Sequence, residues 1–182
     1  MGCDLPPLAH LRCGPNVAVD DFRLAMRRLV GAVTIVTSTD GRTPVGLTAT
    51  AVTSFSAEPA RLLVCVNLRG SSFRTIAESR RMGISLLGAG QAGLARSFGG
   101  LEAHSDECRF AHHRWETLVT GSPVLCDALA VFDCVVDEMM VAHSHAVLIG
   151  EVKAARVGAR EQAPLLYASG QFTTLQEARD PA

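Results

Sequence analysis

The stretch Gly46-Leu-Thr-Ala-Thr-Ala-Val-Thr-Ser-Phe-Ser56 carries small and hydroxylated side chains along its length. It is followed by Ala57-Glu-Pro-Ala60 and then by the apolar run Leu62-Leu-Val-Cys-Val-Asn67. A strand built for packing alone would carry bulkier side chains, whereas Thr, Ala and Ser let a planar ligand approach the backbone and find hydroxyl and amide partners. The stretch therefore predicts one wall of a ligand site.

Most of the chain around this stretch has the pattern of β-strands. A helix is predicted after Asp20, its expected N-cap, because Phe22, Met26, Leu29 and Val30 recur at helical spacing. Two further short helices are expected at 71–78 and 91–98, and a polar segment without clear structure at 99–114. Several strands against few helices indicate an antiparallel barrel. The expected strands are 32–37, 46–54, 62–67, 82–87, 129–140 and 147–157.

Length and charge exclude several classes of protein. With 182 residues, the chain fits one domain, which we place at 19–176, between a flexible extension at 1–18 and a tail at 177–182. Lys plus Arg number 17 and Asp plus Glu 18, so the net charge of −1 gives no basic footprint for nucleic acid or a membrane surface. No apolar run reaches the ~20 residues of a membrane span, and no signal peptide is evident. A soluble cytoplasmic protein is expected.

The cysteines and histidines suggest no disulfide framework and no metal site. The six cysteines include no Cys-x-x-Cys pair, so free thiols are expected. His143 and His145, with Cys108 and other histidines upstream, fit no recognised zinc spacing. His104, His112 and His113 are accordingly interpreted as solvated or hydrogen-bonded structural groups.

The segment Gly88-Ala-Gly-Gln-Ala-Gly93 matches the G-x-G-x-x-G fingerprint of dinucleotide-binding folds. That fingerprint belongs to an alternating βαβ chain with an acidic residue at a strand end about 20 residues later. Asp106 and Glu107 instead lie in the polar segment, and no βαβ alternation follows. The glycines are therefore interpreted as turn residues.

Ser71 and Ser72 lie where the helix after Asn67 is expected to begin. A helix N-terminus offers unpaired amides and the positive end of a dipole, and two hydroxyls beside it would form a phosphate cradle. An ordinary N-cap serine fits the same pattern.

Further motifs follow in a fixed order along the chain. They are Ser71-Ser72-Phe73, the segment 86–98, Arg109-Phe110, Gly121-Ser-Pro-Val-Leu125, His145-Ala-Val-Leu-Ile-Gly-Glu-Val152 and Pro164-Leu-Leu-Tyr-Ala-Ser-Gly-Gln-Phe172. Together they resemble the flavin reductase family with the FMN-binding split-barrel fold, from about Phe22 to Leu175. The resemblance implies a mainly β protein, a Greek-key-like antiparallel split β-barrel with a few short flanking helices. It also implies a homodimer with the flavin near the interface.

The same resemblance implies which residues contact the flavin. His145 matches the histidine of a Gly-Asp-His motif and is the implied catalytic residue, although His143 and Ser144 replace the Gly and Asp. The family more often has Asn and Ser where this chain has Thr50 and Ala51, so backbone contacts are expected there. Ser71 and Ser72 are favoured as phosphate ligands. The implied cofactor-binding residues are Thr48, Ala49, Thr50, Ala51, Cys65, Val66, Asn67, Ser71, Ser72, Gly88, Ala89, Gln91, Phe98, Arg109, Phe110 and Tyr167.

The implied function is that of an NAD(P)H-dependent flavin reductase. Hydride would pass from NADH or NADPH to N5 of FMN or FAD, and the reduced flavin would be supplied to a partner flavin-dependent monooxygenase. One alternative is a flavoprotein on the same fold that passes electrons to another acceptor, such as a corrinoid. Another is a flavin-binding electron carrier without catalytic turnover. The residues do not choose between NADH and NADPH or between FMN and FAD.

Overall fold

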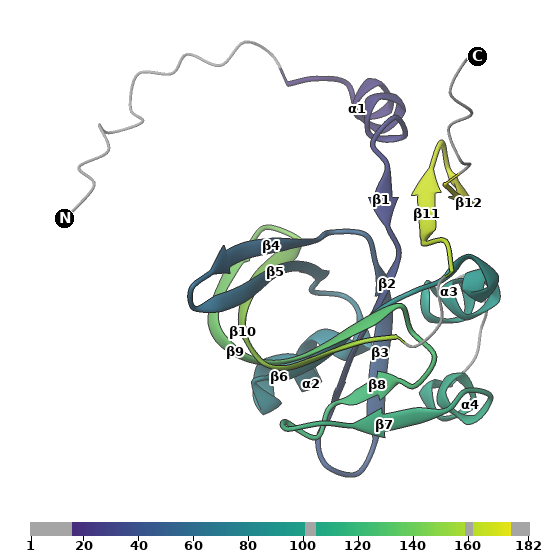
Figure 1. The fold of residues 1–182 in the computed structure, drawn as a ribbon. Coiled ribbons are helices and arrows are strands. Elements are labelled where there is room, and N and C mark those ends of the chain that lie inside the picture. The colour runs from purple at the N-terminus through teal and green to yellow at the C-terminus, as the bar shows by residue number, and fades with distance from the viewer. Residues whose placement is uncertain (1–15, 101–104, 159–161, 176–182) are drawn as a thin grey trace.

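A computed structural model describes residues 16–100, 105–158 and 162–175 of the chain (Figure 1). The predicted extension at 1–18 therefore lies almost wholly outside the described residues, and the predicted tail at 177–182 lies wholly outside them. Cys3, Cys13 and His104 are outside as well. The four cysteines that are described are free thiols.

The described residues form twelve strands, four α-helices and one 3-10 helix, as labelled in Figure 1. The helices are α1 (Val19–Met26), α2 (Ser71–Ser79), η1 (Ala89–Gln91), α3 (Ala92–Phe98) and α4 (Asp106–Ala111). The strands are β1 (Gly31–Ala32), β2 (Thr34–Thr39), β3 (Pro44–Ala49), β4 (Val52–Ala57), β5 (Ala60–Asn67), β6 (Arg81–Leu86), β7 (Trp115–Thr117), β8 (Pro123–Leu125), β9 (Ala130–Ala142), β10 (His145–Val157), β11 (Leu165–Ala168) and β12 (Gln171–Thr174).

The main sheet has seven strands in the order β3-β2-β6-β9-β10-β5-β4, and every neighbouring pair is antiparallel. Its two edge strands, β3 and β4, are consecutive in the chain and are joined only by Thr50 and Ala51. Because two residues span only about 10 Å at most, the two edges must lie close together and the sheet must curl (Figure 1). The predicted antiparallel split barrel is confirmed, with its split between β3 and β4.

The prediction of one strand at 46–54 is wrong at its centre. Ala49 is the last residue of β3 and pairs with Thr34 of β2, whereas Val52 opens β4 and pairs with Val64 of β5. The chain leaves one edge of the sheet at Thr50 and joins the other edge two residues later. The small side chains of the stretch therefore border the split.

The core lies on both sides of β2, whose first five residues are all buried. Successive side chains of a strand point to opposite faces, so Ile35 packs toward α3 and α4 while Val36 packs inside the curled sheet. Cys134 also lies in the inner cluster, where burial raises the pKa of its thiol to about 12. The sheet is thus covered by helices on one side and filled by its own side chains on the other.

The helix predictions are partly confirmed. α2 and α3 form where helices are expected, whereas η1 precedes α3 where a turn was expected. The segment 99–114 contains the unpredicted helix α4, in which the Ser105 hydroxyl accepts from the Cys108 amide at 3.4 Å. Asp20 is not an N-cap: α1 begins after Ala18, Asp20 lies in its first turn, and the helix ends at Met26. None of the described helices is long and apolar enough to cross a membrane.

Candidate functional site

The split of the barrel presents main-chain groups at the bend between β3 and β4. Thr50 and Ala51 are both exposed, and the Ala51 carbonyl accepts a hydrogen bond from the Cys65 amide at 3.0 Å. Among the described residues, the Thr50 and Ala51 amides donate no hydrogen bond. The bend therefore offers two N–H donors on a wall of small side chains.

His145 and Asn67 lie directly opposite one another where β10 begins and β5 ends. Opposite residues on neighbouring antiparallel strands point to the same face, about 5 Å apart at Cβ. Cys65, two residues before Asn67, shares that face and is partly exposed, whereas Val66 points the other way and is 1% exposed in the core. The structure thus brings Cys65, Asn67 and His145 together, and only the main chain of Val66 can contribute.

The imidazole of His145 is held by its neighbour, a contact that the sequence did not reveal. Nδ1 of His145 lies 2.9 Å from the Ser144 hydroxyl, and the Ser144 carbonyl accepts from the Leu68 amide at 3.0 Å. Ser144 therefore ties the turn between β9 and β10 to the end of β5. Because Nδ1 is engaged, Nε2 is the nitrogen left for a ligand.

Ser71 and Ser72, the first two residues of α2, have different surroundings. Ser71 is exposed, whereas Ser72 is 2% exposed and its hydroxyl donates to the Gly46 carbonyl at 2.9 Å. No side chain caps the helix at Gly70. The Ser71 hydroxyl and the first two amides of α2, those of Ser71 and Ser72, are available to an anion, whereas the Phe73 amide donates to the Gly70 carbonyl at 3.2 Å. The Ser72 hydroxyl joins α2 to β3.

Tyr167 lies close to the bend. It pairs with Gly31 in the β1–β11 ladder, and a Cβ on Gly31 would meet the Thr50 Cβ at 2.9 Å. A hollow of about 240 Å³ opens here, lined by Thr48, Thr50, Ala95, Gly99, Tyr167 and Phe172. The Thr48 hydroxyl donates to the Ala95 carbonyl at 2.7 Å, and Ala49 is buried. Thr48 therefore also fastens β3 to α3.

Phe98 and Phe110 are buried in the core, and Arg109 is held in an ion pair. Phe98 and Phe110 are 3% and 8% exposed, and their rings meet edge to face at 5.1 Å between centroids. Trp115, which sequence analysis did not single out, packs on both. Arg109 pairs with Asp106 at 3.1 Å. These aromatic rings fill the core under α3 and α4 and are not open to a ligand.

Gly88, Ala89 and Gln91 form the turn into α3. The Gln91 side chain accepts from the Gly88 amide at 2.8 Å, and the Ala89 amide donates to the Ala163 carbonyl at 2.9 Å. The preceding strand, β6, has only antiparallel partners in the main sheet. The motif is therefore not part of a parallel βαβ unit, as predicted. The prediction that its glycines are turn residues is wrong for Gly93, which lies inside α3, and Gly90 lies in η1.

Helix α3 lies between Arg109 and the bend at Thr50, which were both expected to contact the flavin. Ala95 and Gly99 line the hollow beside Thr50, whereas Gly93 and Ser97 line another hollow with Arg109. The two pairs are offset by two residues, about 200° around a helix, so they lie on opposite faces. Arg109 is therefore on the far side of α3 from the bend at Thr50.

Comparison with known proteins gives consistent matches along most of the chain. Residues 26–176 match a family described as "Flavin reductase like domain". A protein of Variovorax paradoxus named "FMN reductase (NADH) RutF" is 42% identical over 84% of this chain and 83% of its own length. The structure of flavin reductase PheA2 superimposes with a TM-score of 0.80 at 30% identity, covering 88% of this chain and 100% of that one. BorF, the flavin reductase component of a bacterial two-component tryptophan halogenase, also gives 0.80, at 29% identity over 88% and 99% of the two chains.

Proposed function

This chain belongs to the flavin reductase family, and from that premise we propose that it catalyses NADH-dependent reduction of FMN. The observation that carries the proposal is the meeting of the bend at Thr50 and Ala51 with Cys65, Asn67 and His145 at the split of the barrel. The names of the relatives support NADH as the donor and FMN as the acceptor.

The residues at the split fit an isoalloxazine ring. The exposed amides of Thr50 and Ala51 can donate to the ring's carbonyl and nitrogen acceptors, and their small neighbours leave room for a flat group. The Ser71 hydroxyl and the first amides of α2 can hold the phosphate, because a helix N-terminus favours an anion. Arg109 is left out of this site, since it lies across α3.

His145 is the residue proposed to touch the reacting end of the ring. When bound, FMN supplies the electron sink that accepts a hydride. Ser144 holds Nδ1 of the imidazole, so Nε2 can hold or deliver a proton beside Asn67. Tyr167, at the edge of the hollow next to Thr50, is positioned to limit how much water reaches the ring.

Helix α1 supports a homodimer. None of its residues is buried, and Phe22, Leu24 and Met26 are 52%, 61% and 45% exposed. An isolated helix of eight residues is marginal in water, so α1 requires a further contact. A second copy of the chain would cover Phe22 and Met26, which line the hollow of about 340 Å³ between α1 and Tyr167. Phe22→Asp should then yield monomers in analytical ultracentrifugation.

The proposed product is reduced FMN, released to a separate flavin-dependent monooxygenase. The similarity to BorF, a component of a two-component system, supports this role. We also propose a cytoplasmic location, because NADH and free FMN are cytoplasmic metabolites. Loss of all bound flavin on dialysis is expected if FMN is exchanged, whereas retention of one equivalent would favour a bound cofactor.

The test is anaerobic mixing of the purified chain with NADH, or separately NADPH, and an excess of FMN, followed by flavin absorbance. Catalytic bleaching of the excess FMN by NADH is expected. Bleaching limited to one equivalent would favour a flavoprotein that reduces another acceptor, such as a corrinoid. No bleaching despite FMN binding would indicate a flavin-binding module without turnover.

A further inference from the structure

A second pocket lies at the end of α4, separate from the split of the barrel. Its volume is about 540 Å³, and it is lined by His112, His113, Arg114, Cys126, Asp127, Ala128, Gly158 and Gln162. It contains none of the residues placed at the bend beside Thr50. His112 and His113 also line the smaller hollow with Arg109 and Ser97, on the face of α3 that points away from Thr50. We call the larger hollow the histidine pocket.

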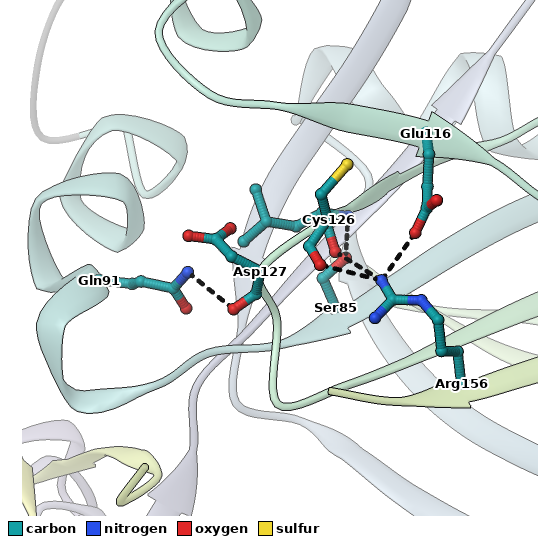
Figure 2. Close-up of polar contacts among 7 residues, drawn as sticks. Ser85, Gln91, Glu116, Cys126, Asp127 and Arg156 are labelled. Carbon is teal, nitrogen blue, oxygen red and sulfur yellow. Dashed lines mark hydrogen bonds and ion pairs between the residues drawn. The ribbon is translucent and has the colours of Figure 1, made fainter. Parts of the chain in front are cut away.

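The floor of the histidine pocket is a loop whose main chain is held from several sides (Figure 2). Arg156 donates to the Leu125 and Cys126 carbonyls, each at 3.2 Å, and is itself paired with Glu116 at 2.7 Å. Gln91 reaches the Asp127 carbonyl from the other side at 3.4 Å.

The amides of the same loop are also engaged. The Leu125 amide donates to the Ser85 hydroxyl at 3.0 Å, and the Cys126 amide donates to the Arg114 carbonyl at 3.0 Å. Because side chains from β10, η1 and β6 and the Arg114 carbonyl fix this loop, its shape does not depend on a ligand. A binding site holds its polar side chains in place when its main chain is fixed, and this loop carries Asp127.

The polar side chains of the pocket are arranged asymmetrically. His112, His113 and Arg114 provide N–H donors on the side of α4, and the Asp127 carboxylate lies on the loop side. Within the described part of the chain, these four side chains form no hydrogen bond or ion pair with another residue. A ligand with an anionic group at one end and hydroxyl donors at the other would satisfy both sides.

From this arrangement, we propose that the histidine pocket binds a nucleoside phosphate, distinct from the FMN held at the split. Arg114 and the two imidazoles would take the phosphate, since a guanidinium forms charge-assisted bonds to it and each imidazole can donate an N–H. Asp127 would accept from the ribose hydroxyls, the partners that carboxylates bind in nucleotide sites. A pocket of about 540 Å³ falls in the range that suits a ligand of this size and would leave inorganic phosphate loosely held.

The test is calorimetric titration of the full chain, saturated with FMN, with ADP as the probe. One ADP per chain should bind while FMN stays bound. Arg114→Ala should weaken ADP at least about tenfold, because a charge-assisted hydrogen bond is lost. Arg42→Ala is the matched control. This exposed arginine lies in the β2–β3 turn, at the end of the main sheet opposite the histidine pocket, so its substitution should leave ADP binding unchanged.

Asp127→Asn separates recognition of the ribose from recognition of the phosphate. It should weaken ADP and leave pyrophosphate binding unchanged, whereas Arg114→Ala should weaken both. Both side chains are exposed, and the main-chain contacts of the loop do not use them. Retained FMN affinity will show that each variant is folded.

Two further readings identify the source of the nucleoside phosphate. If ADP competes with NADH, and Arg114→Ala raises KM for NADH without changing kcat, the pocket takes the adenylate half of the donor. If NADH leaves ADP binding unchanged, the ligand is a separate adenylate. The proposal is overturned if ADP fails to bind the FMN-loaded chain, if ADP displaces FMN, or if Arg114→Ala binds ADP as the parent does. The binding readout holds even if the chain does not oxidise NADH.

Discussion

Thr50, Asn67 and His145 lie exposed along the split of the barrel, whereas Phe98 and Phe110 are buried under α3 and α4. All five are expected from the sequence to contact the flavin, yet their surroundings differ. The exposed set can contact a ligand, and the buried set maintains the packing that holds β3 in place. Substitutions in the buried set should therefore affect stability, and substitutions in the exposed set should affect binding and turnover.

The largest effect is expected at Phe98. Phe98→Ala should lower the free energy of unfolding by about 3–5 kcal/mol, because it removes a buried ring and leaves a cavity beside Phe110 and Trp115. Denaturant titration followed by Trp fluorescence would measure it, since Trp115 is the chain's one tryptophan and belongs to this cluster.

Phe22→Ala is the matched control for Phe98→Ala, because Phe22 is 52% exposed on α1. Its effect on unfolding at low protein concentration, where the proposed dimer dissociates, should stay below about 1 kcal/mol. Equal destabilisation by the two substitutions would contradict the burial of Phe98 in α3 and the exposure of Phe22 on α1.

Two cysteines extend the contrast to chemical reactivity. Cys134 is fully buried and its thiol pKa is raised to about 12, so its thiolate at pH 8 should be about a thousandfold scarcer than that of an ordinary thiol near 8.5. Iodoacetamide followed by peptide mass spectrometry should label the partly exposed Cys65 and spare Cys134. Saturating FMN should protect Cys65 from labelling. If FMN leaves the labelling rate of Cys65 unchanged, Cys65 does not contact the bound flavin.

At the exposed end of the comparison, His145→Ala should lower kcat about a hundredfold, as expected for loss of a positioned proton donor. FMN affinity and thermal stability should change little, because the imidazole is exposed. His143→Asn is the control, since His143 lies in the same turn at φ 53° and Asn tolerates that conformation. A kcat that falls equally in both variants would assign the effect to the turn and not to His145.

Much of the sheet could be predicted because alternation and β-branched residues mark strands locally. The bend at Thr50 could not, since the pattern of small residues continues through it and only the pairing of β3 with β2 and β4 with β5 breaks the run. Helix α4 was missed because its polar first turn, with Asp106 and Glu107, looks like a loop until Phe110 is seen to be buried.

The grouping of the site was the harder part. The order of the motifs predicted that Arg109 and His145 would belong to one site. The sequence does not reveal that Arg109 borders the hollow on one face of α3 while Thr50 borders the hollow on the other face. The pairing of Asn67 with His145 likewise depends on the register between β5 and β10, which are separated by much of the chain. The contact between Ser144 and His145 had one sequence signal, their adjacency, and it needed the turn geometry to become a hydrogen bond.

The smallest expected effects distinguish two adjacent serines, the exposed Ser71 and the buried Ser72. Ser72→Ala should lower the free energy of unfolding by about 1 kcal/mol, because its buried hydroxyl donates to the Gly46 carbonyl. Ser71→Ala should leave stability unchanged and weaken FMN several-fold, while riboflavin, which lacks the phosphate, should bind both variants as it binds the parent. Thermal melts and fluorescence titration with the two flavins would measure these effects. If Ser72→Ala also weakened FMN more than riboflavin, the phosphate would reach deeper into the first turn of α2 than the exposed hydroxyl of Ser71.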